Sequence, residues 1–251
     1  MSSNAIVNGP EMSRRFGRVI RINLVNAPEA ACNFACAYCR SAESTPTSRT
    51  TWWREDDVLS AVAAALQDHP DVECLAISGN GEPTLHPAFA VIVEGLLRIR
   101  ATCAPAMKLA VVSNGSTLDR IEVRHALSQL DVRLMKLDAG DATTFRVING
   151  AVLPLGRLIA GLRYLGDVDL LTRFVRNGER TVDNTSPAAL DAWLGVVREI
   201  GPRTVQICGH DWPSGRAALA DVADGELESI AARVREMGIP ARVYPAPTVP
   251  G

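Results

Sequence analysis

The chain has 251 residues, 47% of them hydrophobic, and its 26 basic and 28 acidic residues give a formal net charge of −2. This size and composition fit one large α/β domain, and the near-zero charge presents no overall field that favours nucleic acid or a membrane surface. The sequence has neither an apolar run long enough to span a bilayer nor a signal-peptide-like N-terminus. Three of its six cysteines are clustered, which fits a reducing compartment better than a disulfide framework. We therefore expect a soluble, cytoplasmic protein.

The N-terminal part of the chain predicts a surface segment, a strand and a helix. Residues 1–18 are polar and rich in arginine, as in a segment that wraps the surface. Residues 19–25 alternate between apolar and polar side chains, with Arg21 and Asn23 on the polar face, which predicts a half-buried strand. Residues 53–69 have helical periodicity and acidic side chains in the first turn.

Beyond residue 70, apolar strands alternate with amphipathic helices. We predict strands at 72–78, 108–113, 132–137, 169–175, 204–208 and 241–244, and helices at 87–100, 119–130, 186–200 and 224–237, with helical material before residue 164. Such alternation implies right-handed crossovers and a parallel sheet. The units are too few for a complete eight-stranded barrel, so a partial (β/α)6 barrel fits, and periodicity alone also allows a doubly wound open sheet. We place one core domain at 19–244 and a flexible tail at 245–251.

The most informative stretch is the C-x3-C-x2-C spacing of Cys32, Cys36 and Cys39. Three thiolates this close cannot all pair as disulfides, but they can converge on one inorganic cluster. A [4Fe–4S] cluster is normally held by four cysteines, so three cysteines leave one iron open to a small molecule. The alternatives are a zinc site completed by a distant His, or three ordinary thiols. Structural zinc sites usually carry two CxxC-type pairs, and the sequence has no second pair.

A glycine-rich loop, Gly79-Asn80-Gly81-Glu82, follows the predicted strand at 72–78. In parallel α/β folds, ligands gather at the carboxyl ends of the strands. Glycines let the backbone approach a ligand closely, and Glu82 can accept hydrogen bonds from an ammonium group. A glycine turn that merely ends the strand is the alternative interpretation.

The cysteine spacing, the aromatic Tyr38 before the last cysteine and the string Gly-Asn-Gly-Glu-Pro-Thr-Leu-His-Pro at 79–87 resemble the radical S-adenosylmethionine (SAM) superfamily. The string is similar to a branch related to wybutosine-synthesis enzymes of tRNA modification. The resemblance implies a partial (β/α)6, TIM-like barrel and a [4Fe–4S] cluster whose open iron chelates SAM. It also implies reductive cleavage of SAM to methionine and a 5′-deoxyadenosyl radical. The family's Gly-Gly-Glu motif, which binds the amino group of SAM, is matched at Gly81 and Glu82, whereas Asn80 departs from it.

Polar residues at the ends of the next two predicted strands are further candidates for binding SAM. Ser113 and Asn114 can hydrogen-bond its carboxylate or ribose, as equivalent positions do in the family, although Asn114-Gly115 is also a common turn dipeptide. Lys136 and Asp138 face the same side of their strand, where a charged pair is costly unless it meets a ligand or is fully paired. They fit contacts to SAM or to a substrate, and a closed Lys136–Asp138 ion pair is the alternative.

The remaining predicted strands end in residues with weaker signals. Arg173, Arg176 and Asn177 surround the end of the predicted strand at 169–175, where an arginine can hold a carboxylate by a bidentate contact. The alternative is that these side chains are simply solvated. Cys208 can donate a hydrogen atom to a substrate radical and His210 can move a proton, which makes these two the candidate catalytic residues. A lone cysteine in a strand is more commonly a small buried hydrophobe. Cys74 and Cys103 are expected to be structural.

The resemblance implies an enzyme that takes hydrogen from a substrate. The short chain, in which no extended C-terminal cluster domain is visible, favours a small molecule, such as a natural-product intermediate, or a nucleoside as that substrate. The resemblance also implies a flavodoxin- or ferredoxin-type reductant, which a basic face near the cysteines could receive; that face would comprise Arg14, Arg15, Arg18, Arg21 and Arg40. No separate basic RNA-binding module is visible, so tRNA is the less favoured substrate. A non-catalytic Fe–S electron carrier or redox sensor, and an activase of a partner enzyme, are the alternative functions.

Overall fold

The computed structural model describes residues 5–26, 31–39, 51–209, 219–220 and 222–245. Two compact units divide the chain: a first unit of Met1–Asn33 and Ser44–Leu134, and a second unit of Phe34–Glu43 and Met135–Gly251. The division falls inside the cysteine motif and again inside a strand, so each unit consists of two pieces of the chain. Two residues named from the sequence, Arg40 and His210, lie outside the described residues.

The first unit contains strands β1 (Val7–Ser13), β2 (Gly17–Ile22), β3 (Cys74–Ile77) and β4 (Lys108–Ser113), in that order, followed by the start of β5 (Val132–Lys136). β1 and β2 are antiparallel, whereas β2, β3 and β4 are parallel, with Val19 opposite Cys74 and Cys74 opposite Lys108. β3 is buried at every position, which is why its sequence, Cys-Leu-Ala-Ile, has no polar face.

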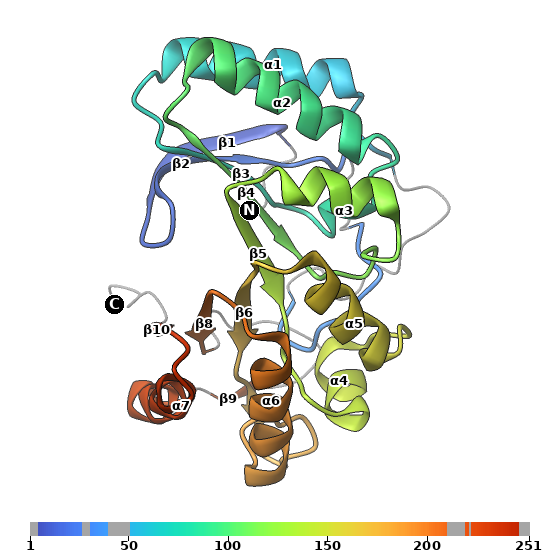
Figure 1. Cartoon of the computed structure of the whole chain (residues 1–251), viewed down its shortest axis with the longest axis vertical. Helices are drawn as coiled ribbons and strands as arrows, with labels where there is room; N and C mark the ends of the chain where they lie inside the picture. Colours follow the sequence, from blue (N-terminus) through green and yellow to red (C-terminus); the bar gives the residue numbers. More distant parts are fainter. Residues whose placement is uncertain (1–4, 27–30, 40–50, 210–218, 221, 246–251) are drawn as a thin grey trace. The chain divides into compact units, whose positions relative to one another are not determined.

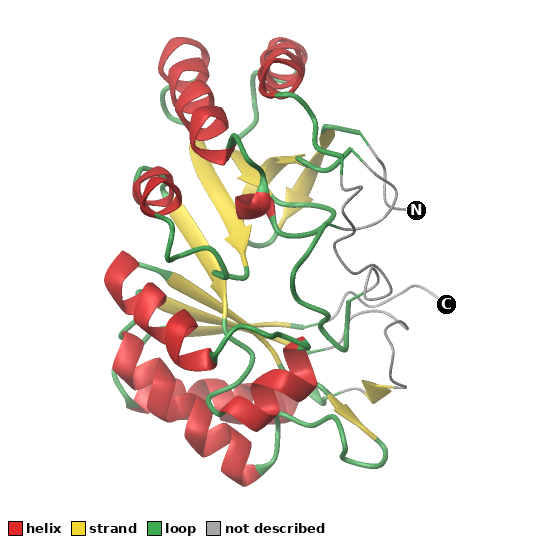
Figure 2. Ribbon diagram, turned by 90° about the vertical axis from the view of Figure 1, so that its right-hand side faces the viewer, coloured by secondary structure: helices red, strands yellow, loops and turns green. Residues whose placement is uncertain are grey.

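Three helices of the first unit lie on one side of its strands (Figures 1 and 2): α1 (Glu55–Asp68), α2 (Phe89–Cys103) and α3 (Ile121–Ser128). α1 lies beside α2, and α2 lies beside α3. α1 buries Val58, Val62 and Leu66, which repeat about once per helical turn, and it carries acidic side chains in its first turn. A short 3-10 helix, η1 (Pro83–Leu85), connects β3 to α2.

The second unit continues from the end of β5 through β6 (Asp169–Arg173), β8 (Thr204–Cys208) and β10 (Ala241–Tyr244). β6, β8 and β10 are parallel. Its helices are α4 (Ala142–Asn149), α5 (Leu155–Leu165), α6 (Pro187–Ile200) and α7 (Asp224–Glu236). A separate antiparallel pair joins β7 (Arg176–Asn177) to β9 (Leu219–Ala220).

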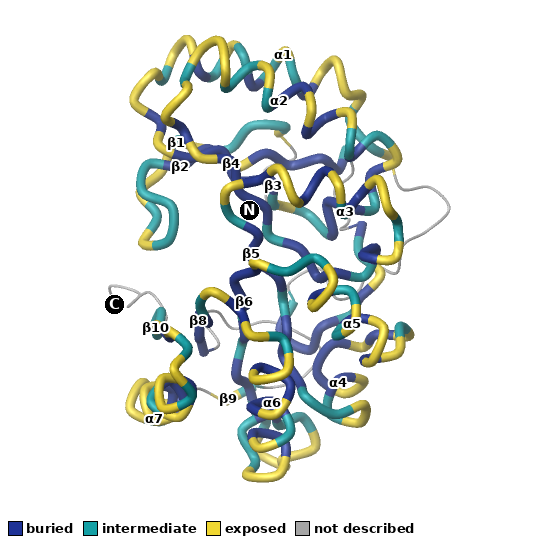
Figure 3. The backbone as a smooth tube through the Cα atoms, in the orientation of Figure 1, coloured by how far each residue is buried: buried dark blue, intermediate teal, exposed yellow. Residues whose placement is uncertain are grey.

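Local sequence explains where the helices of the second unit begin and what they bury. Asp141 caps α4, because its carboxylate accepts hydrogen bonds from the backbone N–H groups of Thr143 and Thr144, 3.0 and 2.9 Å away. α6 buries an apolar face on which Trp193 packs edge-on against Phe174, with ring centroids 5.1 Å apart. Burial is concentrated along the strands and on the inner faces of the helices, shown in dark blue in Figure 3.

Most of the predicted elements are confirmed. The strands at 108–113, 204–208 and 241–244 have the predicted bounds, and the helix ends lie within about three residues of prediction. β1 was not predicted, because its sequence contains the turn-like Gly9-Pro10, and the short β7 and β9 were also missed. The expected domain bounds at 19–244 stay a prediction. None of the helices in the described part of the chain is long and apolar enough to cross a lipid bilayer.

Candidate functional site

The three motif cysteines are divided between the two units. Cys32 ends a loop of the first unit and is half-buried, whereas the buried Cys36 and the half-buried Cys39 belong to the second unit. All three are free thiols. Among the described residues, neither unit by itself holds a group of three or more His, Cys, Asp and Glu side chains placed to bind a metal ion. The surroundings of each part of the motif are therefore described separately.

In the first unit, the glycine-rich loop after β3 holds the backbone just before Cys32. Ala31 forms a parallel bridge with Gly81, and its carbonyl accepts a hydrogen bond of 2.7 Å from the Glu82 N–H. Gly81 has φ +113°, and a Cβ at this position would overlap the carbonyl group of Ala31. Only glycine fits here, so this glycine serves to dock the cysteine loop as well as to turn the chain.

Asn23 fastens the same glycine-rich loop to the end of β2. It is 2% exposed, and its Oδ1 accepts hydrogen bonds from the N–H groups of Asn80 and Val25, each 3.2 Å away. Its side chain also fills the space beside Gly79. The sequence placed Asn23 on the polar face of its strand together with Arg21, but in the structure Asn23 is buried. A buried asparagine that completes loop hydrogen bonds leaves no mark in the alternation pattern.

Glu82 is buried and engaged by the protein itself. Its Oε1 accepts hydrogen bonds from the Thr84 N–H (3.0 Å), the Thr84 hydroxyl (2.6 Å) and the Ser113 hydroxyl (2.7 Å), and its Oε2 accepts one from the Asn114 N–H (2.6 Å). Burial raises the pKa of Glu82, although these hydrogen bonds oppose the shift. Glu82 thus ties the predicted glycine-rich loop to the predicted Ser113-Asn114 pair at the end of β4.

Asn114 reaches from the end of β4 to the cysteine loop. Its Nδ2 lies 3.6 Å from the Cys32 Sγ and 3.0 Å from the Asn33 Oδ1, and its Oδ1 accepts a hydrogen bond of 2.9 Å from the Ser116 N–H. These contacts place Glu82, Ser113, Asn114 and Cys32 around one another in the first unit. The sequence singled out all four residues but gave no means of predicting the amide-to-sulfur contact.

In the second unit, the C-terminal end of α4 holds the backbone around Cys36. The N–H groups of Ala35 and Ala37 donate to the carbonyls of Asn149 (2.9 Å) and Ile148 (2.8 Å), which are left without partners inside the helix. Gly150 ends α4 with φ +54° and lies against Ala35. The loop therefore docks on a helix end, whose unpaired carbonyls meet its unpaired N–H groups.

Asp138, just after β5, is the centre of the polar contacts in the second unit. It is 1% exposed; its Oδ2 accepts hydrogen bonds from the Tyr38 hydroxyl and from the Asn149 Nδ2 (2.7 Å), and its Oδ1 accepts one from the Arg173 N–H (2.8 Å). The alternative of a closed Lys136–Asp138 ion pair is wrong among the described residues, because the carboxylate of Asp138 accepts hydrogen bonds from other donors and the Lys136 Nζ lies over the Tyr38 ring instead. Asp138 thus fixes the cysteine loop through its hydrogen bond with Tyr38.

Two cations face the ring of Tyr38, the residue between Cys36 and Cys39 that the sequence drew attention to. The Lys136 Nζ lies 4.5 Å and the Arg173 guanidinium 5.3 Å from the ring centroid. Burial pulls the pKa of Lys136 down, but the negative charges of Cys36 and Asp138 outweigh it and hold this pKa above its ordinary value. Burial likewise raises the pKa of Cys36, an effect that Lys136 opposes.

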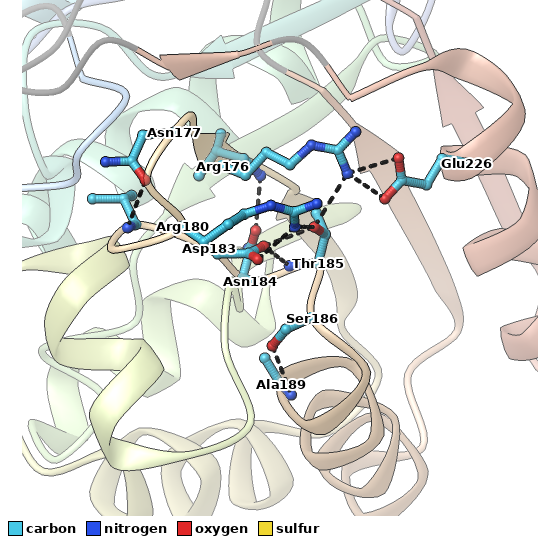
Figure 4. Close-up of polar contacts among 11 residues, drawn as sticks. Arg176, Asn177, Arg180, Asp183, Asn184, Thr185, Ser186, Ala189 and Glu226 are labelled. Carbon is cyan, nitrogen blue, oxygen red and sulfur yellow. Dashed lines mark hydrogen bonds and ion pairs between the residues drawn. The ribbon is translucent and has the colours of Figure 1, made fainter.

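Asn184 joins the ends of β5 and β6 behind these charges. Its Nδ2 donates to the carbonyls of Asp138 and Arg173, both 2.8 Å away, and its Oδ1 accepts a hydrogen bond of 2.7 Å from the Val175 N–H. The hairpin that precedes Asn184 has its own polar contacts (Figure 4), including an ion pair of Arg176 with Glu226 on α7 at 2.6 Å. The sequence named Arg173 but not Asn184.

The remaining candidates from the sequence lie in ordinary surroundings. Cys208 is 3% exposed, and its thiol donates to the Thr172 carbonyl 3.6 Å away on the neighbouring strand, so its catalytic role stays a prediction. Cys74 is buried in β3, where burial raises its pKa to about 12, and Cys103 is exposed. Arg18 and Arg21, expected on a basic docking face, form ion pairs with acidic residues at 2.8 and 2.5 Å. Such pairing weakens a basic face at that position.

A family model for the radical SAM superfamily matches residues 29–174, more than half of the chain. The chain belongs to the radical SAM superfamily. It is 28% identical to the GTPase Obg of Brachyspira hyodysenteriae over 233 residues, and this matched region covers 88% of this chain and 32% of that protein. It is 29% identical to a GTP 3′,8-cyclase of Xanthomonas campestris pv. campestris over 160 residues, and this matched region covers 60% of this chain and 43% of that protein. The radical SAM chain thus spans less than half the length of these two relatives.

Solved structures of other radical SAM proteins have the same fold. A radical SAM methyltransferase from Sphaerobacter thermophilus superimposes with a TM-score of 0.69 and 15% identity, over 90% of this chain and 66% of that one. TYW1 with a lysine-pyruvate adduct superimposes with a TM-score of 0.65 and 16% identity, over 87% of this chain and 73% of that one. The predicted α/β fold with a partial, TIM-like barrel is confirmed.

The radical SAM family uses a [4Fe–4S] cluster and SAM, and the residues around the motif fit such a cluster. The cysteines are free thiols, and amide N–H groups face two of their sulfurs, Asn114 facing Cys32 and Asn149 facing Cys36. Hydrogen bonds of this kind support thiolate ligands. Lys136 adds a positive charge that favours the thiolate form of Cys36.

Proposed function

We propose that this chain is a radical SAM enzyme in which Cys32, Cys36 and Cys39 hold a [4Fe–4S] cluster. When bound, the cluster and SAM supply a 5′-deoxyadenosyl radical that takes hydrogen from the substrate. The observation that carries the proposal is the pair of sulfur-directed amides, Asn114 on Cys32 and Asn149 on Cys36. Ordinary buried thiols have no need of such donors, whereas thiolate ligands do.

Each unit offers part of the proposed SAM site. In the first unit we assign Gly79, Asn80, Gly81, Glu82, Ser113 and Asn114 to this site. Because Glu82 already accepts four hydrogen bonds from the protein, its main task is to orient the loop and the Ser113-Asn114 pair. In the second unit, the ammonium of Lys136 lies over the Tyr38 ring and suits a carboxylate, and Asp138 orients Tyr38 beside it.

We propose a small molecule or a nucleoside as the substrate and a flavodoxin- or ferredoxin-type protein as the reductant. The similarity to a GTP 3′,8-cyclase supports a nucleotide-like substrate. The two cations at Tyr38, Lys136 and Arg173, support a substrate or cofactor with an anionic group. tRNA modification is the less favoured alternative.

The test is anaerobic reconstitution with iron and sulfide, followed by reduction with dithionite in the presence of SAM. We expect a [4Fe–4S] signal in electron paramagnetic resonance (EPR) and formation of 5′-deoxyadenosine. Cys36→Ala should abolish both, whereas Cys103→Ala, at an exposed cysteine outside the motif, is the matched control and should retain both. A cluster that forms but never cleaves SAM would favour an electron carrier. Zinc bound in place of iron would contradict the proposal.

A further inference from the structure

Asn149, the last residue of α4, places its side chain against a ligand sulfur. Its Nδ2 lies 3.4 Å from the Cys36 Sγ and 2.7 Å from the Asp138 Oδ2. The residue is 1% exposed, and Cys36 is 6% exposed, so water does not compete for this contact. An amide nitrogen carries two hydrogens, and each of them has one of these two acceptors.

The orientation of this amide follows from its neighbours. The Asp138 Oδ2 also accepts the Tyr38 hydroxyl, so an ionised carboxylate, which only accepts, stands opposite the Asn149 side chain. Reversing the amide would set the Asn149 Oδ1 against both the carboxylate and the sulfur. In the orientation shown, this Oδ1 has no donor among the described residues. The two hydrogen bonds that the amide N–H groups donate offset the cost of this unsatisfied oxygen.

Backbone contacts keep Asn149 and Cys36 together. The residue before Cys36 donates its N–H to the Asn149 carbonyl, and the residue after it donates to the Ile148 carbonyl, at 2.9 and 2.8 Å. Phe34 packs edge-on against Phe145 one turn back on α4, with centroids 5.5 Å apart. These contacts fix the position of the amide relative to the sulfur.

A donor at a ligand sulfur acts on the electron affinity of a cluster. Reduction of an Fe–S cluster increases the negative charge on its sulfur ligands, so an N–H group that faces a sulfur stabilises the reduced state more than the oxidised state. In this buried place the effect is weakly screened. We propose that Asn149 is a positioning residue that raises the reduction potential of the cluster through its hydrogen bond to Cys36, an inference that rests on the proposed function.

The experiment is an EPR-monitored redox titration of the reconstituted full chain without SAM. Asn149→Leu removes the donor and keeps a side chain of similar size. Asn184→Leu is the matched control, since Asn184 is also 1% exposed, donates two hydrogen bonds and lies in the same unit, but it has no contact with a cysteine. We expect the midpoint potential of Asn149→Leu to fall by up to about 59 mV, a tenfold weaker equilibrium for one-electron reduction, and that of Asn184→Leu to stay near wild type.

Equal potentials in wild type and Asn149→Leu, or an equal shift in both variants, would overturn the role of Asn149. If Asn149→Leu does not retain iron, Asn149→Ala, which also removes the donor, is titrated in its place and must show the same fall. A wild-type chain that binds no cluster would overturn the proposed function itself, and this result is seen in the iron and sulfide content before any variant is made.

Discussion

The two units hold their parts of the cysteine motif by the same backbone arrangement, built from different elements. In the first unit, the residue before Cys32 lies against Gly81 in a loop that follows a strand; in the second, the residue before Cys36 lies against Gly150 at the end of a helix. In both, the glycine has a positive φ and an asparagine amide faces the cysteine sulfur. A loop end and a helix end thus provide equivalent anchors.

The electrostatic surroundings of the two anchors differ. On the first-unit side, the amide of Asn114 faces the Cys32 sulfur and also donates to Asn33, and the carboxylate of Glu82 accepts hydrogen bonds from hydroxyl and backbone donors. Around Cys36, by contrast, charged groups gather about Tyr38. The first unit thus orients its part of the cysteine motif by hydrogen bonds, whereas the second unit also places charged side chains beside its part.

Replacing the two buried carboxylates by amides is the strongest test of this difference. Asp138→Asn should lower the free energy of unfolding by about 3 kcal/mol, because it turns one oxygen into a donor facing a donor and leaves nearby cations uncompensated. Glu82→Gln also sets a donor against the Asn114 N–H, but it should cost only about 1–2 kcal/mol, because its oxygen can keep the three donors now on Oε1 and the described donors to Glu82 carry no charge. Urea unfolding of both variants gives the two values, and equal costs would break the comparison.

Alanine at the two anchoring glycines tests the shared backbone arrangement. Gly81→Ala should destabilise by roughly 3 kcal/mol, since a Cβ would overlap the Ala31 carbonyl in addition to the strain at φ +113°. Gly150→Ala should cost about 2 kcal/mol, because its Cβ would lie 2.7 Å from the Ala35 carbonyl oxygen in addition to the left-handed strain, a smaller overlap than at Gly81. Gly195→Ala, in α6 with open space around it, is the control and should stabilise by about 0.5–1 kcal/mol. Thermal unfolding ranks the variants, and a neutral Gly81→Ala would contradict the docking role.

The smallest expected effect is a pH dependence confined to the first unit. His86 is 2% exposed; its Nδ1 accepts from the Ala88 N–H, so its Nε2 carries the hydrogen that meets the Trp53 carbonyl. Burial lowers the pKa of His86 below 6.5. The unfolded state therefore binds more protons, and stability is full above about pH 6.5 and falls below it, by about 1.4 kcal/mol per unit of pKa difference.

Urea unfolding at pH 7.5 and 5.5 measures this change. Tryptophan fluorescence distinguishes the units, because Trp52 lies 5.2 Å from the His86 ring in the first unit, whereas Trp193 packs on Phe174 in the second. His86→Gln should lose this part of the pH dependence, and His125→Gln, at an exposed position, should keep it. A wild-type stability that is constant between the two pH values would disprove the role of His86.

Periodicity predicted most strands and helices, and the resemblance of the cysteine motif and the glycine-rich string to a known family predicted the chemical family, because these depend on residues near one another in the chain. The alternation of Lys136 and Asp138 also predicted that both side chains face the same side, and both contact Tyr38. The partners of these residues could not be predicted. The Tyr38–Asp138 hydrogen bond joins residues 100 positions apart, and Asn149 reaches Cys36 across 113 positions. A lone buried asparagine such as Asn23, Asn149 or Asn184 has no sequence signature, because its role is defined only by the groups that surround it.

The three hydrogen bonds of Asn184 have a consequence for how this family member can change over evolutionary time. They provide hydrogen-bond partners for the backbone carbonyls of Asp138 and Arg173 and for the N–H of Val175. These three groups therefore need no hydrogen bond from the residues of the hairpin between Val175 and Asn184. That hairpin is free to accept insertions, deletions and new side chains without disturbing the charges beside Tyr38. Asn184 thus separates a segment that can diversify from a framework that must stay constant.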